Sequence, residues 1–466
     1  MATESQLQWG GRFAAAPDAA LLAFGSSLGD DLVLAAFDVR CSRGHVAALH
    51  GGKLLSDADA AALRAALDTV AADIANGTFE AFARAGTFED VHGAIDARVR
   101  ELAPAAGESL HAGRSRNDQV ATTLLLYAAD RAQRGREVCA AIAGAVEDRA
   151  SAALRSGALL AATTHWQPAQ PVLLAFWLDA CAQAFVRAAR RFADVERAAR
   201  ETCPLGSGAV AGSSLPLDRW AAARELGFAR PSRNALDTIG DRDVALDLLH
   251  AAARAAIAAS RPSEEFVIWS TPAFGYARLG DAAATGSSLM PQKRNPDPFE
   301  LVRASAAHIA ATYTGALATT TGIALSYHRD LQETKALVIR GTERALATLD
   351  TFARAFAELA FNESAMSARA ADGYTVATDL ADAVIASGKT ARAAHRAVGE
   401  RVLRAEVEGR PLDASDTLAL GVPEAPVDAR GSIDGKRTAG STGPAAVAES
   451  IAQTISEIAR LKEPAV

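Results

Sequence analysis

The sequence has few cysteines, only four among 466 residues. They are Cys41, Cys139, Cys181 and Cys203, which lie far apart, without a CxxC pair and without a histidine at zinc-finger spacing. This spacing excludes a disulfide framework and a cysteine-based zinc site. Scattered cysteines without partners are typical of a reducing compartment, so we expect a cytoplasmic protein.

The chain also lacks a strong excess of charge of one sign. Its formal net charge is -7, its pI is near 5.8, and acidic and basic residues are interspersed. Because phosphate binding needs a basic face, this composition argues against nucleic acid as a partner, although a local basic pocket is compatible with it. The hydrophobic share of 50% is typical of a folded globular protein.

Long apolar runs are missing as well. The opening residues MATESQLQWGGRF do not combine a basic segment with an apolar one, which excludes a secretory signal there. The most apolar run, PVLLAFWLDACAQAFV, is interrupted by Asp179 and is shorter than the ~20 residues that a membrane span needs. We therefore predict that this run is a buried helix and that the protein has no membrane partner.

What the sequence has in quantity is helical periodicity. Apolar residues recur at three- and four-residue spacing in five long segments, at about 119–155, 171–202, 241–270, 299–320 and 333–361. Such lengths favour a helical bundle, and faces that are apolar on more than one side predict burial in an oligomer. Strand alternation is scarce, so we expect a mainly α fold with at most a small hairpin.

Composition also indicates how the chain is divided. The segment beyond Asn362 is richer in glycine, proline and short elements than the long-helix region before it. We predict an N-terminal helical domain at 1–113, a central long-helix domain at 114–365 and a small C-terminal helical domain at 366–466. The polar breaks between the long helices are the expected places for a site.

One such break is the stretch TGSSLMPQKRNPD, residues 285–297. Its glycine and two prolines predict a loop, which carries Ser287, Lys293 and Asn295. A cation and an amide beside a hydroxyl can bind a carboxylate, and fixed donors on that carboxylate make the neighbouring carbon more acidic. Ser287 could then act as a base if Lys293 and loop amides stabilise its alkoxide. Taken alone, the stretch also fits an ordinary surface loop.

Two further breaks carry groups suited to anion binding and proton transfer. HAGRSRNDQ places Ser115, Arg116 and Asn117 immediately before a predicted helix, where an anion could bind, although a solvated helix cap is the alternative. TTHW contains Thr164 and His165, and histidine is the side chain best suited to proton transfer near neutral pH. A structural role for this histidine is the competing interpretation.

In combination these blocks resemble a known family. WGGRF, FEDVH, HAGRSRNDQV, TTHWQPAQP, PLGSGAVAG, RNALDTIGDRD, TGSSLMPQKRNPD and YHRDLQETK occur in this order and are similar to the argininosuccinate lyases, within the fumarase and aspartase superfamily. The resemblance extends from Trp9 to about Lys335 and continues more weakly in GYTVATDLADAVIASG. GSSxMPxKxN marks the superfamily, whereas GRSRNDQ, MPQKRNPD and DLQE resemble the argininosuccinate branch.

The resemblance implies a fold and an assembly. Members of this superfamily have three domains, the middle one a long-helix bundle, and form homotetramers whose bundles pack into a central helical core. Each of their active sites combines segments of three subunits. The family reaction needs no metal and no organic cofactor, so the resemblance predicts none here.

The resemblance also implies a reaction, the reversible anti elimination that splits argininosuccinate into arginine and fumarate. By motif, Ser287 is the base that removes the Cβ proton, and Lys293 and Asn295 hold the resulting aci-carboxylate. His165 is placed where the leaving nitrogen is protonated. The positions that resemble the family's substrate-binding residues are Ser27, Asp31, His92, Ser115, Arg116, Asn117, Thr164, Tyr327, Gln332 and Lys335.

Several departures from the family pattern keep alternatives open. Ala112 replaces a frequent threonine, His328 a usual asparagine and Gly240 a common serine. Because Ala112 and His328 adjoin substrate-contacting positions, a related carbon-nitrogen lyase acting on another N-substituted aspartate is the second hypothesis. A non-catalytic protein, like the lens crystallins that share the fold, is the third. Retention of the site residues argues against the third, since site residues rather than fold decide function.

Overall fold

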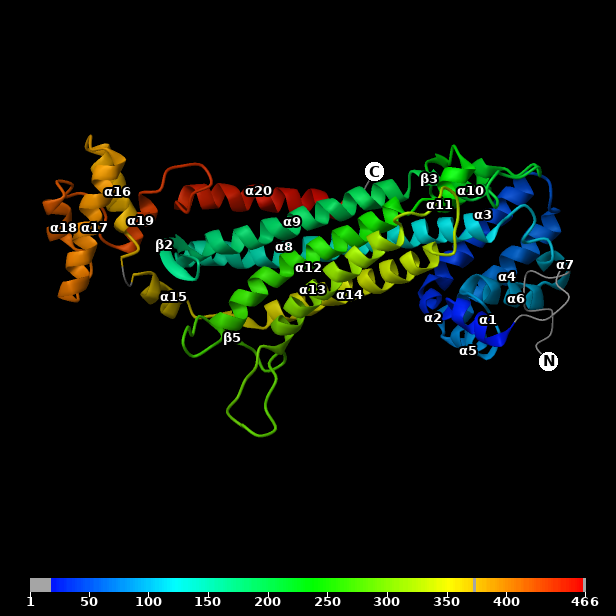
Figure 1. Ribbon diagram of the computed structural model, residues 1–466, viewed down its shortest axis with the longest axis horizontal. Helices are drawn as coiled ribbons and strands as arrows, with labels where there is room; N and C mark the ends of the chain where they lie inside the picture. Colours follow the sequence, from blue (N-terminus) through cyan, green and yellow to red (C-terminus); the bar gives the residue numbers. More distant parts are fainter. Residues whose placement is uncertain (1–17, 372–373, 464–466) are drawn as a thin grey trace.

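The computed structural model describes residues 18–371 and 374–463, which leaves the WGGRF block outside the described residues. The chain is elongated, with a cluster of short helices at each end of a long bundle (Figure 1). Helices dominate and strands are few and short, so the predicted mainly α fold is confirmed. The division into three domains remains a prediction.

The N-terminal end consists of helices that pack around α3. These are α1 (Ala19–Gly25), α2 (Leu28–Asp31), the 3-10 turn η2 (Leu32–Leu34), α3 (Ala35–Gly51), α4 (Asp57–Ala75), α5 (Thr78–Ala85), α6 (Val91–Leu102) and α7 (Pro104–Gly107). Residues 19–51 together are long and apolar enough to cross a membrane by length and composition. They are divided at Ser26, which is extended, and they include the fully buried Asp31 and Asp38.

Five long helices form the bundle. They are α8 (Arg116–Ser156), α9 (Leu174–Ala199), α12 (Asp243–Trp269), α13 (Asp297–Thr319) and α14 (Leu331–Ala357), and each matches a segment predicted from periodicity. α8 begins at the capping box of Ser115 and Asp118 and ends at Gly157, whose φ is 67°. The apolar run expected to be a buried helix belongs to α9, where Leu174, Leu178 and Phe185 are buried.

Aromatic side chains pack the bundle at one end. The Phe266 ring of α12 lies 5.0 Å from that of Phe299 on α13 and 5.9 Å from that of Phe356 on α14. α13 is less well covered, because only five of its 23 residues are buried, and Leu301 and Leu317 are 64% and 41% exposed. The greater part of α13, from Ala304 to Thr319, has no Asp, Glu, Lys or Arg.

The described residues form three strand pairs, whereas at most one hairpin was expected. β1 (Leu159–Thr164) and β2 (Gln167–Leu173) form an antiparallel hairpin between α8 and α9. Shorter pairs are formed by β3 (Thr202–Cys203) with β4 (Arg230–Pro231), and by β5 (Ala277–Leu279) with β6 (Leu359–Phe361). The hairpin includes the TTHWQPAQP block, so that block is two strands rather than the predicted irregular break.

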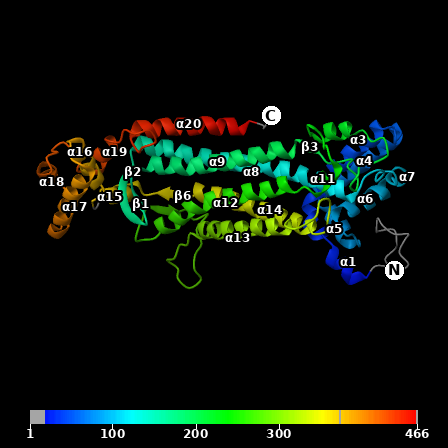
Figure 2. The same ribbon diagram turned by 45° about the horizontal axis from the view of Figure 1, so that its top comes forward.

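The C-terminal segment occupies the opposite end of the bundle and then returns along it (Figure 2). The short helices are α15 (Glu363–Ala370), α16 (Ala377–Ala386), α17 (Ala391–Glu408), α18 (Ala414–Ala419) and α19 (Ala429–Asp434). The last helix, α20 (Pro444–Lys462), packs along α8 and α9 instead of remaining with them. The connecting helices α10 (Arg219–Leu226) and α11 (Ala235–Gly240) lie at the N-terminal end.

Candidate active site

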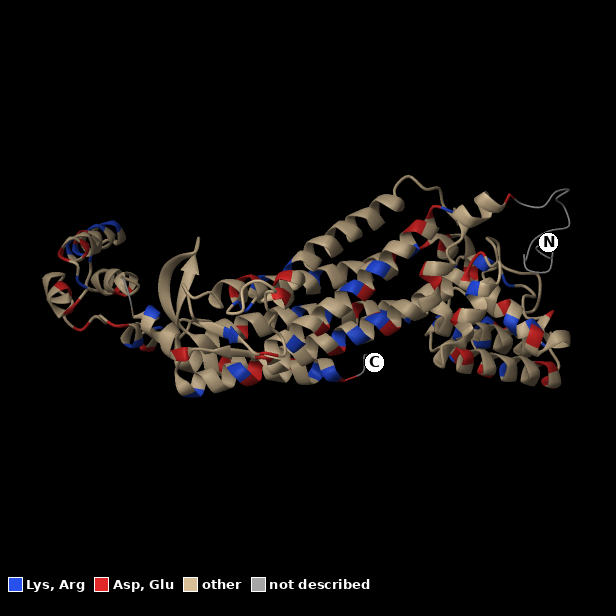
Figure 3. Cartoon of the chain, turned by 90° about the horizontal axis from the view of Figure 1, so that it is seen from below, with Lys and Arg blue, Asp and Glu red and all other residues tan. Residues whose placement is uncertain are grey.

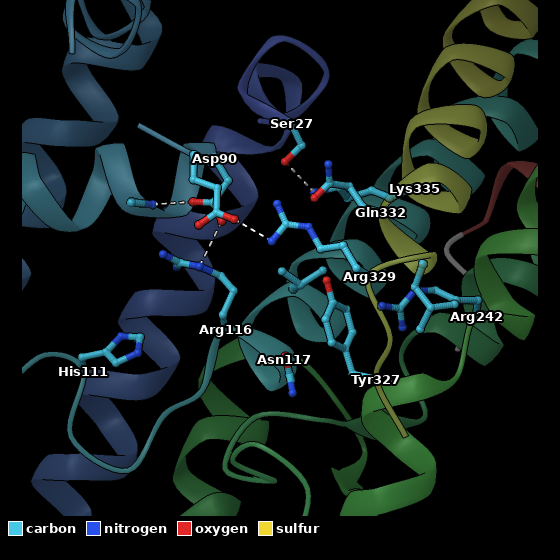
Figure 4. A pocket seen from close by; sticks show the side chains of 14 residues that line it. Ser27, Asp90, His111, Arg116, Asn117, Arg242, Tyr327, Arg329, Gln332 and Lys335 are labelled. Carbon is cyan, nitrogen blue, oxygen red and sulfur yellow. Dashed lines mark hydrogen bonds and ion pairs between the residues drawn. The ribbon is translucent and has the colours of Figure 1, made fainter. Parts of the chain in front are cut away.

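A cavity of about 340 Å³ lies where the N-terminal helices meet the bundle. Figure 4 shows polar side chains converging on it from α2, the start of α8 and the start of α14. Six residues predicted to bind substrate line it: Ser27, Arg116, Asn117, Tyr327, Gln332 and Lys335. The structure therefore brings together segments that are some 300 residues apart in sequence.

The first turn of α8 presents Arg116 and Asn117 to the cavity. Ser115 is the N-cap, and its hydroxyl accepts a hydrogen bond from the Asn117 amide, so Ser115 orients this turn. The Asp118 carboxylate accepts hydrogen bonds from three backbone amides. One is that of Ser115, and the other two are those of Gly206 and Gly208, at 2.9 and 2.8 Å. Burial raises the pKa of Asp118 to about 6, although these three amides and Arg114 oppose the rise.

The glycine-rich block PLGSGAVAG packs directly against this helix start. Gly208 has a φ of 63°, and a Cβ there would lie 2.7 Å from the Gly212 carbonyl oxygen. The side-chain Nδ2 of Asn117 donates a hydrogen bond to the Ala209 carbonyl at 2.9 Å. The backbone of this block therefore approaches the start of α8 closely, and the contact fixes Asn117 at the cavity.

One side of the cavity is acidic. Arg116 pairs with Asp90 at 3.0 Å, and Arg329 pairs with Glu89 at 2.6 Å. Burial acts to raise the pKa of Asp90, but the charges of Arg116 and His92 outweigh it and the pKa is lowered. Asp90 also accepts the Gly93 amide at 2.7 Å as the N-cap of α6, so it remains a carboxylate that holds Arg116 in place.

Ser27, Asp31 and Lys335 form a second polar group beside the cavity. The Ser27 hydroxyl donates to Asp31 at 2.5 Å, and the Lys335 ammonium lies 2.7 Å from the other Asp31 oxygen. Asp31 is fully buried and does not line the cavity, but it pairs with Lys335, which does. Gln332 donates to the Gly25 carbonyl at 3.1 Å, which connects α14 to the end of α1.

His92 lies behind the cavity and does not line it. Its ring is fully buried and lies 2.8 Å from Asp38, which also accepts Gln119 at 2.8 Å and Thr123 at 3.2 Å. Burial acts to raise the pKa of Asp38, but His92, Arg114 and the Gln119 hydrogen bond lower it well below the usual range. This charged network joins α3, α6 and α8, so within one chain His92 is buried behind the cavity and does not line it, unlike the substrate-binding position that its motif predicted.

Some cavity residues had no role assigned from the sequence: Glu89, Asp90, His111, Arg242 and Arg329. Arg242 is 4% exposed and donates only to the carbonyls of Ile239 and Asp241, so it has no carboxylate partner among the residues described. Burial lowers the pKa of Arg242, and burial with two nearby arginines lowers that of His111 to about 4. A buried unpaired guanidinium is suited to bind a carboxylate ligand.

Gly240 explains one departure from the family pattern. A Cβ on Gly240 would lie 2.4 Å from the Ser326 carbonyl oxygen. Ser326 has a φ of 85° and directly precedes Tyr327. Glycine at 240 thus permits the backbone conformation that directs Tyr327 into the cavity.

The predicted base is not at this cavity. Ser287, Lys293 and Asn295 belong to a loop that projects from the side of the bundle between β5 and α13 (Figure 1). The Ser287 oxygen accepts the amides of Leu289 and Met290 at 3.3 and 3.1 Å. The Lys293 ammonium has no carboxylate partner in the described part of the chain, so it is available to a ligand.

Thr164 and His165 form a third group. They lie at the exposed end of the β1–β2 hairpin, which is at the end of the bundle opposite the cavity (Figures 1 and 2). One chain therefore contains an anion-binding cavity, a serine held by amides with a free lysine, and an exposed histidine. Each group is suited to part of an acid–base elimination, but they are not in contact within one chain.

Comparison with known proteins identifies the family. A family model described as Lyase matches residues 11–311. An argininosuccinate lyase of Nocardia farcinica is 40% identical over 460 residues, covering 97% of this chain and 96% of the relative. One of Mycolicibacterium smegmatis is 39% identical, covering 97% of both. The chain belongs to the argininosuccinate lyase family. The resemblance inferred from the motifs is confirmed.

Solved structures agree with this family's fold at lower identity. EDDS lyase in complex with formate has a TM-score of 0.77 and 23% identity, covering 96% of this chain and 94% of that one. A 3-carboxy-cis,cis-muconate lactonizing enzyme from Pseudomonas putida has a TM-score of 0.68 and 17% identity, covering 96% and 98%. At these identities the comparison shows the shared fold alone.

Proposed function

We propose that the protein splits argininosuccinate reversibly into arginine and fumarate. The observation that carries the proposal is the near-complete coverage by argininosuccinate lyases at about 40% identity, together with retention of every site residue expected from the motifs. The proposed role is that of a carbon-nitrogen lyase in arginine biosynthesis, located in the cytoplasm, with neither metal nor cofactor.

The proposed chemistry is an elimination that balances on the substrate alone. Ser287, as the alkoxide, takes the Cβ proton, and the electron pair of that C–H bond becomes the double bond of fumarate. The Cα–N bond breaks, and the departing nitrogen of arginine takes a proton from the acid, which we assign to His165. Lys293 and Asn295 stabilise the aci-carboxylate between these steps, because charge develops on its oxygens.

The loop geometry supports Ser287 as the base. Two amides already point at its oxygen, at 3.3 and 3.1 Å, and they would stabilise an alkoxide as it forms. Lys293 adds a positive charge that no described carboxylate neutralises. The cavity complements this loop, because Arg242 and Arg116 are suited to the carboxylates of the succinate part.

We propose that the complete site forms between chains of a homotetramer. The three groups of site residues lie on separate parts of one chain. α13 has the exposed residues Leu301 and Leu317 and no Asp, Glu, Lys or Arg from Ala304 to Thr319, and charged residues are sparse along part of the bundle in Figure 3. Such a surface is typical of a subunit interface. When the bundles of several chains pack together, the cavity of one chain would receive the β1–β2 hairpin and the Ser287 loop from neighbouring chains.

The direct test is product formation by the purified protein given argininosuccinate without added metal. We expect fumarate, followed by its ultraviolet absorbance, and arginine, followed by chromatography, in equal amounts. If neither forms while other amines are added to fumarate, the elimination chemistry stands and the substrate is another N-substituted aspartate. No lyase reaction in either direction would contradict the proposal.

A further inference from the structure

The hairpin that carries His165 ends in a strained turn. Thr164 pairs with Gln167, so His165 and Trp166 alone form the turn, and their φ values are 55° and 61°. Two-residue turns with positive φ at both positions strongly favour asparagine and glycine. A histidine followed by a tryptophan therefore adopts this turn at a cost in backbone energy.

The base of the hairpin is anchored, whereas its tip is exposed. The Leu159 amide donates to the Ser367 hydroxyl at 3.1 Å, and the Leu173 amide donates to the Thr442 hydroxyl at 2.8 Å. The register shifts between Ala162 and Thr163, and the residues from Thr163 to Pro168 are exposed. The direction of the tip is thus set by a fixed base, while the tip itself contacts little of its own chain.

Trp166 differs from the two tryptophans that belong to the bundle core, the buried Trp269 and the partly buried Trp177. Trp177 and Trp269 contact each other at 4.6 Å within the aromatic core, whereas Trp166 is 49% exposed and makes no aromatic contact among the described residues. About half of the Trp166 surface is left uncovered by its own chain, so burial within that chain offsets the backbone strain only in part. The contact of its ring is therefore expected on another molecule.

We propose that Trp166 is a positioning residue whose ring packs on a second copy of this chain and thereby fixes His165 at that copy's cavity. This inference rests on the proposed function, in which His165 serves a site that its own chain cannot complete. His165 is next to Trp166 in the turn, and the cavity of its own chain lies at the opposite end of the bundle. His165 can therefore serve only the cavity of another copy, so a second copy is the expected partner of the Trp166 ring. The ring anchors the tip, and the anchored tip directs the imidazole.

The variants Trp166→Gly and Trp166→Phe distinguish the effect of backbone strain from the effect of losing the aromatic ring. Glycine relieves the strain at this positive φ, which offsets the loss of the ring's contact with the second copy, so we expect the thermal midpoint of Trp166→Gly to stay close to that of the native protein. Without the ring, His165 is misplaced, and kcat should fall about 10- to 100-fold while KM changes less than about threefold. Phenylalanine retains an apolar ring, so Trp166→Phe should keep kcat within about threefold of the native value.

Trp220→Phe provides the matched control, because Trp220 is 55% exposed on α10 and does not line the cavity. It should leave kcat unchanged. Oligomer mass is measured for every variant by analytical ultracentrifugation. Native kcat in Trp166→Gly would overturn the proposal, and so would loss of the oligomer, because positioning requires an intact assembly.

A second readout does not depend on the reaction. If Trp166 packs on another chain, acrylamide quenching of tryptophan fluorescence in the native oligomer should be no greater than in Trp166→Phe, since the ring is shielded. A clearly quenched Trp166 component would overturn the inference even if the enzyme is active. An inactive native protein with a shielded Trp166 would instead reject the proposed function while retaining the subunit contact.

Discussion

Ser287 is the residue on which the proposed chemistry depends most directly. Its oxygen accepts two backbone amides and has no side-chain partner among the described residues. A serine hydroxyl is a weak base unless its alkoxide is stabilised, so the amides and Lys293 are as necessary as the oxygen itself. The residues around it in the loop are exposed and make few packing contacts.

Ser287→Ala is expected to lower turnover about 10³-fold or more, because the Cβ proton loses its acceptor. The oligomer and its thermal midpoint should not change, since the hydroxyl contacts only loop amides. Steady-state kinetics and sedimentation measure the two effects. Ser288→Ala is the matched control, because Ser288 is exposed and adjacent, and it should retain turnover within about threefold. Near-native turnover in Ser287→Ala would reject this base.

At the scale of elements, the cavity depends on how helix ends and loops fit together. The start of α8 is held by its capping box and by the glycine-rich block, and the Tyr327 loop is held against α11 at Gly240. Backbone atoms meet closely at both places, so a single methyl group can displace a side chain that lines the cavity.

Gly240→Ala is expected to raise KM about tenfold and to lower the free energy of unfolding by about 1–3 kcal/mol, because the new methyl group collides with the Ser326 carbonyl. Substrate-dependent rates and denaturant unfolding measure both. Gly399→Ala in α17 is the control, since nothing lies within 4 Å of a Cβ there. Unchanged KM in Gly240→Ala would show that the Tyr327 loop is not set by this contact.

The packing of α20 on α8 and α9 includes a buried pair of carboxyl groups. Glu147 on α8 is 1% exposed, and its pKa is raised to about 9 by burial and by the neighbouring Asp179. Asp179 accepts the hydroxyls of Ser450 and Thr454 on α20, at 2.6 and 2.9 Å. Glu147 is therefore protonated at neutral pH in the folded protein and ionised in the unfolded chain.

This difference makes folding depend on pH. The folded state binds the extra proton between the unfolded pKa near 4.5 and the folded pKa of about 9, so the free energy of unfolding falls as pH rises through this window. We expect Glu147→Gln to be more stable than the native protein at pH 8 and to lose part of this dependence. Denaturant unfolding at pH 6 and pH 8 measures this pH dependence, with Glu137→Gln as the control, because Glu137 is exposed on the same helix. An equal pH dependence in Glu147→Gln and the native protein would contradict the assignment.

At the scale of the whole molecule, the sequence predicted the long helices well, because their apolar spacing is a local property of each segment. A small hairpin was allowed, but its place at β1–β2 was not predicted, since its prolines and its His165–Trp166 turn lack the usual hairpin signals. The return of α20 to the bundle depends on long-range packing that no local pattern encodes. Arg242 was missed because a single arginine in GDRD gives no sign of burial.

The site residues show the same difference between what a local pattern predicts and what depends on long-range packing. The motifs gave the candidate side chains, and six of these candidates line one cavity. Their separation into three places on one chain follows from the length of α8, which carries its start to one end of the bundle and the hairpin to the other. The central claim is therefore that neighbouring chains supply the missing groups.

Mixing two inactive variants tests this claim most directly. Ser287→Ala lacks the base, and Arg116→Ala lacks a cavity cation, and each homo-oligomer should be nearly inactive on argininosuccinate. After the two are dissociated together and reassembled, random mixing should restore about one quarter of native turnover if the two groups at each site come from different chains. No recovery in a reassembled mixture of native oligomer mass would mean that one chain supplies both groups, which would contradict the account.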